Sequence, residues 1–265
     1  MRAALISIAT LLMAACSTAP SNQQAVADLA PTGKLRAAIN VGNAVLAARP
    51  ATPGGEPTGI SVDLARELGR RLGVPVQLVV FDAAGKVVDA GRTGGWDIAF
   101  VALDPKRAAE IAQSPPYVQI EGSYLVKNDS PLKSNDEVDR KGHRVVVGLN
   151  SAYDLYLTRE LKQAQIVRTP TSGAVVDTML KENYEVSAGV KQALENDARR
   201  IPGVRLLPGR FMVINQAMAS QRNKEAGARY VREFIEEMKA SGFVARAIER
   251  HQQPSAVVAP PGDPK

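Results

Sequence analysis

Short apolar runs of the β type alternate with amphipathic helical patterns along most of the chain, and this alternation limits the fold more than any other sequence feature. The predicted strands are Lys34–Asn40, Val76–Phe81, Trp96–Val101, Tyr117–Val126, Arg144–Leu149, Tyr184–Val190, Val204–Leu207 and Phe211–Ser220. The predicted helices are Ser61–Gly73, Ser151–Lys162, Glu225–Arg250 with an interruption at Gly242, and two more that begin at Asp104 and Ser172. Such alternation favours parallel or mixed sheets covered by helices, in one sheet or two.

The composition is that of an ordinary globular protein, since 45% of the residues are hydrophobic and 23% are charged. The only cysteine, Cys16, excludes a disulfide within the chain and any site built on paired cysteines. With only two histidines in the sequence, we expect neither a metal site nor a cofactor. The formal charge of +6 comes from basic residues scattered among acidic ones, without an arginine-rich run. We therefore expect a solvated basic surface and no nucleic-acid partner.

The N-terminus has the pattern of an export signal. A basic residue precedes a short apolar run that ends in two alanines before Cys16, so residues 1–15 are predicted to be a signal peptide. The small residues before the cysteine resemble the lipobox of bacterial lipoproteins, which implies a membrane anchor through a lipid on Cys16. Cleavage after Ala15 or Ala19 without lipidation is the alternative.

Both ends of the chain are rich in small polar residues or prolines. Residues 16–32 are predicted to form a lipidated, flexible tether. Residues 251–265 contain closely spaced prolines and a glycine, which exclude a helix or a central strand, and are predicted to be a disordered tail.

Several motifs resemble those of the bacterial extracellular solute-binding proteins of family 3, in the same order along the chain. The motifs are Gly33–Arg36, Gly59–Val74, Trp96–Ala99, Asp104–Ala108 and Pro116-Tyr117. The resemblance implies an α/β fold of the periplasmic-binding-protein type, with two α/β lobes joined by two crossover strands and a ligand cleft between them. It places residues 33–125 and 211–250 in the first lobe and residues 126–210 in the second.

The same resemblance implies a function. We expect the substrate-binding component of an ABC-type importer, which captures a small carboxylate-bearing metabolite, amino-acid-like or an organic acid, in the periplasm. Its expected partners are that ligand, the permease of the importer and the membrane that holds the lipid. We expect a monomer and no enzymatic activity.

Arg107 is the strongest candidate for a ligand-binding residue. Asp104 as N-cap and Pro105 as first helical residue place Arg107 in the first turn of a helix, where free N–H groups favour an anion. A guanidinium can also donate two parallel hydrogen bonds to a carboxylate. In the second lobe, Asn150, Ser151 and Ala152 follow a strand and enter a helix, and matching family positions bind the same carboxylate. Ser151 is equally typical of a plain helix cap.

Two positions depart from the family pattern for an α-amino acid. Ala102 stands where the family often has a serine or threonine, and Gly189-Val190-Lys191 supplies no aspartate for the ligand's ammonium. Because a desolvated ammonium without an acceptor is costly, binding of an ordinary amino acid is in doubt. Lys191 is predicted either to meet a second anionic group or to be solvated.

Two further residues follow strands of the first lobe. Asn43 is typical of a ligand donor and equally of a turn residue. Phe81 is predicted to be an apolar wall of the cleft or part of the core.

Two other functions remain as alternatives. Periplasmic cyclohexadienyl dehydratases resemble these binding proteins and need a cleft acid, for which Asp104, Glu121 and Glu185 are the candidates. A sensory or scaffolding solute-binding domain is the second alternative, and no kinase or other signalling segment in the sequence supports it.

Overall fold

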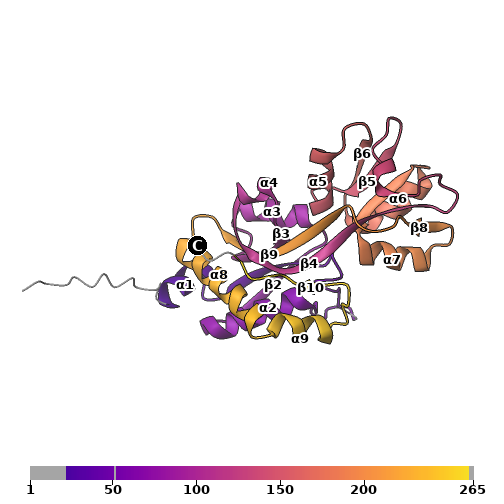
Figure 1. Ribbon diagram of the computed structural model, residues 1–265. Helices are drawn as coiled ribbons and strands as arrows, with labels where there is room; N and C mark the ends of the chain where they lie inside the picture. The colour runs from indigo at the N-terminus through magenta and orange to yellow at the C-terminus, as the bar shows by residue number, and fades with distance from the viewer. Residues whose placement is uncertain (1–21, 51, 263–265) are drawn as a thin grey trace, which may run out of the picture.

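The computed structural model describes residues 22–50 and 52–262 and consists of two α/β lobes (Figure 1). Lobe 1 contains the parallel strands β1 (Leu35–Asn40), β2 (Val76–Phe81) and β3 (Ile98–Ala102). Its helices are α1 (Asn22–Leu29), α2 (Ile60–Leu72), α3 (Ala84–Arg92), α4 (Pro105–Ala108), α8 (Glu225–Ala240) and α9 (Phe243–Arg250). Each strand of lobe 1 is followed by a helix, as the alternating pattern predicts.

Lobe 2 repeats the arrangement on a smaller scale. Its strands are β5 (Arg144–Gly148), β6 (Gln165–Thr169), β7 (Val186–Val190) and β8 (Val204–Leu206), and β5 pairs in parallel with both β6 and β7. Its helices are α5 (Ala152–Glu160), α6 (Val175–Lys181) and α7 (Lys191–Arg200), with 3-10 turns η1 (Asn135–Glu137) and η2 (Ser172–Ala174).

Two long antiparallel strands, β4 (Ile111–Lys127) and β9 (Met212–Gln221), run through both lobes and connect them. The sheet is therefore continuous, in the order β2-β1-β3-β9-β4-β7-β5-β6. In Figure 1 these two strands cross the middle of the molecule between the lobes. The fold class expected from the sequence, two α/β lobes joined by two crossover strands, is confirmed.

Helices cover both faces of the lobe 1 sheet, which gives the lobe two apolar cores. The apolar face of the amphipathic helix α2 is buried in the larger core, with Ile60, Leu64 and Leu68 fully inaccessible to solvent. On the other face α3 packs over Trp96, whose indole N–H donates to the carbonyl of Val87 at 2.7 Å. Burial of such large side chains contributes roughly 1.5–3 kcal/mol each.

The start of α2 differs from the prediction. The helix was predicted to begin at Ser61, but it begins one residue earlier, at Ile60, and Gly59 is its N-cap, at a φ of 136°. Glycine tolerates this backbone conformation where other residues are strained. The Ser61 hydroxyl instead lies 3.2 Å from the hydroxyl of Tyr117, in the interior.

The structure corrects the prediction of a tether over residues 16–32. Residues 22–29 form α1, which buries Ala25 and Leu29 beside α8. The carboxylate of Asp28 accepts a hydrogen bond from the N–H of Gly227 at 3.0 Å, which joins the two helices. Ala25 and Leu29 are four residues apart and therefore share one face of a helix. The polar residues around them made this short helix difficult to predict. Cys16 and the predicted signal peptide lie outside the described residues.

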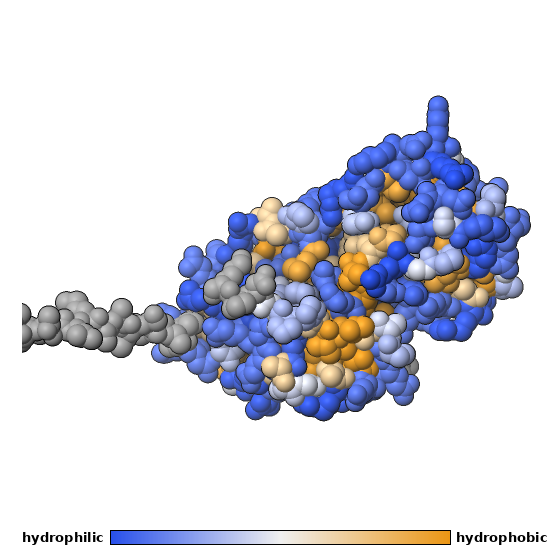
Figure 2. Space-filling model, in the orientation of Figure 1, coloured by the Kyte–Doolittle hydropathy of each residue, from blue (hydrophilic) through white to orange (hydrophobic). Residues whose placement is uncertain are grey.

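The predicted disordered tail is also corrected as far as Gly262. Residues Val257–Val258 form β10, which pairs antiparallel with Val118 and Gln119 of β4. Ala256 and Ala259 are buried on either side of it. The prolines at 254 and 260 lie outside this short ladder, so they do not remove a donor from it. In Figure 2 apolar surface gathers over the middle of the face shown, where Figure 1 draws the crossover strands and β10.

Candidate ligand-binding cleft

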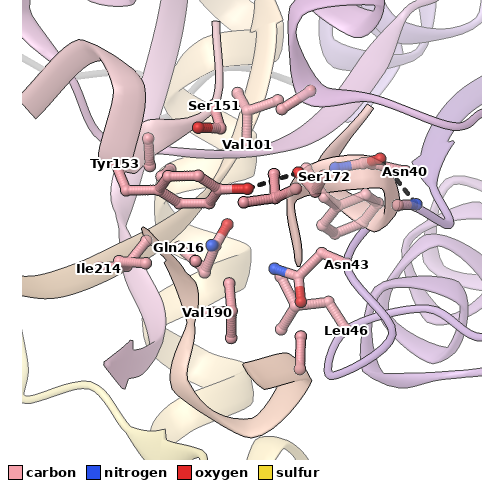
Figure 3. A pocket seen from close by; sticks show the side chains of 18 of the residues that line it. Asn40, Asn43, Leu46, Val101, Ser151, Tyr153, Ser172, Val190, Ile214 and Gln216 are labelled. Carbon is pink, nitrogen blue, oxygen red and sulfur yellow. Dashed lines mark hydrogen bonds between the residues drawn. The ribbon is translucent and has the colours of Figure 1, made fainter. Parts of the chain in front are cut away.

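A cavity of about 60 Å³ lies between the lobes, at the carboxyl ends of their parallel strands (Figure 3). Lobe 1 contributes Asn40 and the turn after β1, the end of β3, and Arg107. Lobe 2 contributes residues that follow β5, β6 and β7, and the crossover strand β9 contributes Ile214 and Gln216. Open α/β sheets bind their ligands at this edge.

The N-terminal ends of helices from both lobes meet at this cavity. Ser61 of α2, Ala84 of α3, Ala152 of α5 and Val190, the N-cap of α7, all line it. Helix N-termini carry unpaired N–H groups and a partial positive charge. The backbone therefore gives the cavity a positive potential that adds to that of its side chains.

Arg107 is 2% exposed and lines the cavity from the first turn of α4. Asp104 fixes this turn, because its carboxylate accepts a hydrogen bond from the N–H of Lys106 at 2.8 Å. The guanidinium donates to the carbonyl of Ala102 at 3.0 Å and, across the cleft, to the carbonyl of Asn150 at 2.8 Å.

Two hydrogen bonds to carbonyls leave further N–H groups of Arg107 available. Within the described part of the chain, no carboxylate lies within ion-pair distance of it. Burial lowers the pKa of Arg107 to about 10 and the nearby charge of Asp104 opposes this, so the side chain stays charged at neutral pH. A buried cation without an anion is costly, which makes this position suited to an anionic group.

The lobe 2 wall is a rigid turn at the start of α5. Ser151 is the N-cap, as predicted, and its hydroxyl accepts from the N–H of Asp154 at 3.0 Å. Asn150 has a φ of 55°, and its N–H donates to the carboxylate of Asp154 at 2.8 Å. Arg168 pairs with the same carboxylate. The turn is thereby fixed with Ala152 facing the cavity.

Two amide side chains lie in the cavity without a partner. Gln216 is 5% exposed, and its amide makes no hydrogen bond to a described residue. The amide oxygen of Asn43 is buried and also lacks a hydrogen-bond partner among the described residues. By contrast, the amide oxygen of Asn40 accepts from the N–H of Gly42 at 3.0 Å. Figure 3 shows Gln216 on the side of Ile214 and Asn43 on the side of Leu46.

The hydroxyl of Tyr153 donates to Ser172 at 2.7 Å (Figure 3). This bond connects the first turn of α5 to the loop after β6, so two walls of lobe 2 are held together. Tyr153 was predicted only to lie within a helix and Gln216 only within a strand, and neither was predicted as a site residue. The polar pair Asn215-Gln216 in an otherwise apolar stretch of the strand is the signal that marked this position in the sequence.

The structure brings five of the predicted residues to the cavity: Arg107, Ala102, Asn43, Ser151 and Ala152. Asn150 meets the site through its backbone carbonyl, while its side chain lies in an adjoining pocket.

Two predicted residues lie elsewhere. The ammonium of Lys191 is 2.8 Å from the carboxylate of Glu121 on β4, because the first turn of α7 directs this side chain toward the crossover strand. Phe81 is a half-buried residue that packs against the smaller core under α3, so the core interpretation applies.

The lobes are in contact on both sides of the cavity, which describes a closed form. Arg159 of α5 pairs with Asp104 across the cleft at 2.8 Å. Gly85 of α3 approaches Asn150 so closely that a Cβ at position 85 would lie 2.8 Å from the Cβ of Asn150. Near β10, the hydroxyl of Ser255 donates to the side chain of Gln192 on α7 at 3.1 Å.

Two α/β lobes closed around a cavity of this kind define a binding protein of the periplasmic type. The chain belongs to the bacterial extracellular solute-binding proteins, family 3, whose family model matches residues 44–254. No curated protein matches the sequence. Within residues 22–50 and 52–262, no helix is long and apolar enough to cross a membrane.

Solved structures share the fold at low sequence identity. A solute receptor for L-cysteine of Neisseria gonorrhoeae is 20% identical, with a TM-score of 0.74, covering 87% of this chain and 94% of that chain. A mutant of ArgBP from T. maritima is 18% identical, with a TM-score of 0.72 over 86% and 99% of the chains. An ancestral amino acid-binding protein, described as a precursor of cyclohexadienyl dehydratase, is 20% identical, with a TM-score of 0.69 over 82% and 94%.

Proposed function

We propose that this protein is the substrate-binding component of an ABC-type importer and captures a small carboxylate-bearing metabolite between its lobes. The burial of Arg107 carries the proposal. Arg107 is 2% exposed and lines the inter-lobe cavity, and its guanidinium has no carboxylate partner within the described residues. A ligand carboxylate would supply the missing anion and could accept two parallel hydrogen bonds.

The N–H groups at the start of α5 support the same assignment from the other lobe. Ala152 lines the cavity in the first turn of α5, where backbone N–H groups have no partner inside the helix. A carboxylate held between Arg107 and this turn would touch both lobes, so its binding free energy would favour the closed form over an open one.

The importer role and its permease partner are inferred from the family and from similar structures. One of them is a substrate-binding protein of an amino acid ABC transporter, and another of this kind, from Streptococcus pneumoniae, has L-arginine bound. A carboxylate is the group that all amino acids share with simple organic acids. We infer a monomer that acts in the periplasm, held to the membrane by a lipid on Cys16.

We favour binding over catalysis, although one similar structure is a precursor of a dehydratase. The three candidate acids are Asp104, Glu121 and Glu185, of which Asp104 caps α4 and pairs with Arg159. Lys191 and Arg210 lower the pKa of Glu121 by hydrogen bonding, and none of the three acids lines the cavity.

Glu185 also forms an ion pair with a basic side chain. It pairs with Arg144, which lowers its pKa by hydrogen bonding. A general acid needs a raised pKa and access to the ligand, whereas the basic partners of Glu121 and Glu185 lower the pKa of both carboxyl groups.

The test is a thermal-shift screen of monocarboxylates, dicarboxylates and amino acids, followed by calorimetry. A ligand that binds only the folded protein raises its melting temperature by mass action. We expect at least one small carboxylate to do so, and the corresponding uncharged amide to have no effect. Binding of an amide as tightly as its acid would contradict the proposal, and turnover of prephenate or arogenate would establish the dehydratase instead.

A further inference from the structure

The charges that face the cavity are unbalanced. Among the described residues only Arg107 and Asp197 are charged and line it. Asp197 lies on α7, and its carboxylate already pairs with Arg200 at 2.8 Å. Arg107 has no such partner, and the convergent helix N-termini add further positive potential. A ligand with one negative charge neutralises this cavity, whereas a zwitterion leaves it positive.

Next to Arg107, the cavity presents a neutral amide instead of an acid. Gln216 on β9 is the register partner of Ala102 on β3, and the carbonyl of Ala102 accepts a hydrogen bond from Arg107. Arg107 and Gln216 therefore both adjoin Ala102 at the same edge of the sheet, and both line the cavity. Ala102 has only a methyl group, and it lines the cavity with them.

A ligand whose carboxylate lies on Arg107 would place its 2-substituent in this region. An ammonium there would lie close to a buried cation, with neutral amide groups as its acceptors, which is unfavourable in a cavity sheltered from water. A hydroxyl can donate to the Gln216 amide oxygen, and a keto oxygen can accept from its N–H groups. The buried amide oxygen of Asn43 also requires a donor, which a hydroxyl can supply without adding a positive charge to the cavity.

The cavity also limits ligand size. Its volume of about 60 Å³ is well below the ~150 Å³ of an engineered cavity that holds benzene. Building on the proposed function, we propose that the cleft selects small 2-hydroxy and 2-keto monocarboxylates over the matching 2-amino acids, and that Gln216 reads the oxygen at position 2.

Pairs of ligands with the same shape test the proposal directly in the wild-type protein. Calorimetry would compare L-lactate with L-alanine, and glycolate with glycine, with pyruvate as the keto acid. We expect each hydroxy acid to bind at least ~10-fold more tightly than its amino acid, because the ammonium loses hydration without gaining a counter-ion. Amino acids that bind as tightly as the hydroxy acids, or more tightly, would overturn the proposal.

Gln216→Glu keeps the shape of the side chain and adds a negative charge. We expect this variant to lose affinity for L-lactate and gain affinity for L-alanine. Gln119→Glu is the matched control: it makes the same change on β4, where Gln119 bonds to Asn215 outside the cavity lining, and its ligand preference should equal that of the wild type. An unchanged preference in Gln216→Glu would remove this residue from recognition.

The outcomes also separate this inference from the proposed function. If carboxylates bind through Arg107 but amino acids bind more tightly than hydroxy acids, the proposed function stands and the inferred selectivity is wrong. If no carboxylate binds, or if Arg107→Ala binds like the wild type, the proposed function fails and the selectivity inferred from it fails as well.

Discussion

Arg107 of lobe 1 donates a hydrogen bond to the backbone carbonyl of Asn150 in lobe 2, with a distance of 2.8 Å. The side chain that we assign to the ligand therefore also joins the lobes. Closure of the two lobes and recognition of the ligand therefore both involve the Arg107 guanidinium. A ligand that neutralises Arg107 would stabilise the closed form at the same time. Differential affinity for the two forms is what allows a ligand to shift such an equilibrium.

The ion pair between Arg159 and Asp104 should slow opening of the cleft. Arg159 is 45% exposed, so we expect Arg159→Ala to cost only about 0.5–1 kcal/mol, seen as a ~2–5-fold faster ligand dissociation. Stopped-flow measurement of dissociation checks this. Arg140→Ala is the control, because Arg140 pairs with Glu137 within lobe 2. Equal dissociation rates in the wild type and Arg159→Ala would show that this pair does not hold the lobes closed.

Membrane attachment should depend on Cys16. Cys16→Ala removes the only thiol that could carry a lipid, and we expect the variant to partition into the aqueous phase of a detergent extraction. The wild type should partition into the detergent phase. Ser17→Ala, which changes the neighbouring residue and keeps the thiol, is the control. A wild-type protein found in the aqueous phase would rule out the anchor.

Glu67 should stabilise the protein in a pH-dependent way. Hydrogen bonds from Arg70 and Arg71 lower the pKa of Glu67 to about 2. A carboxylate with a lowered pKa stabilises the fold above its unfolded pKa, and this contribution is lost as the pH falls from about 4.5 toward 2. Glu67→Gln should therefore reduce stability by about 1 kcal/mol at pH 7 and by less at pH 3.

Thermal unfolding of both proteins across this pH range provides the measurement. Glu160→Gln is a suitable control, because Glu160 is exposed at the end of α5 and has no ion-pair partner within the described residues. A stability difference for Glu67→Gln that stays constant from pH 7 to pH 3 would show that the carboxylate charge is not responsible.

The elements with strong periodicity could be predicted from the sequence. The amphipathic helix α2, the cap of α5 by Ser151 and the break at Gly242 between α8 and α9 are as predicted. The position of Arg107 in the first turn of α4 could also be predicted, because an N-cap residue at Asp104 and a proline at 105 mark the start of a helix.

Helix α3 was not predicted, and tertiary packing explains why. Gly85 and Gly91 weaken the helical pattern, yet both are required by close contacts. A Cβ at Gly91 would lie 2.6 Å from the ring of Trp96, and Gly85 faces Asn150 of lobe 2. Glycine is needed at these two positions because other parts of the chain pack closely against them. The local sequence pattern does not reveal such contacts.

The role of Gln216 could not be predicted for a similar reason. Its position beside Ala102 depends on the register between β3 and β9, which are separated by more than a hundred residues. The same holds for Lys191, whose charge is met by Glu121 on the crossover strand. A sequence reveals that a residue is polar, but only the pairing of strands shows which polar residues share a cavity.

Arg107→Ala tests the central claim most directly. Calorimetry with the tightest carboxylate from the screen should show a loss of about 2–5 kcal/mol of binding free energy, the range for removing one partner of a desolvated charged pair. Arg107→Lys should also bind poorly, because an ammonium lacks the planar two-bond geometry. Arg66→Ala, an exposed lobe 1 arginine paired with Glu56, is the control and should bind like the wild type.

A melting temperature measured without ligand would confirm that each variant is folded. The account predicts that Arg107→Ala folds and no longer binds the carboxylate. A folded Arg107→Ala protein with near-wild-type affinity would contradict the account, since the buried guanidinium would then not hold the ligand.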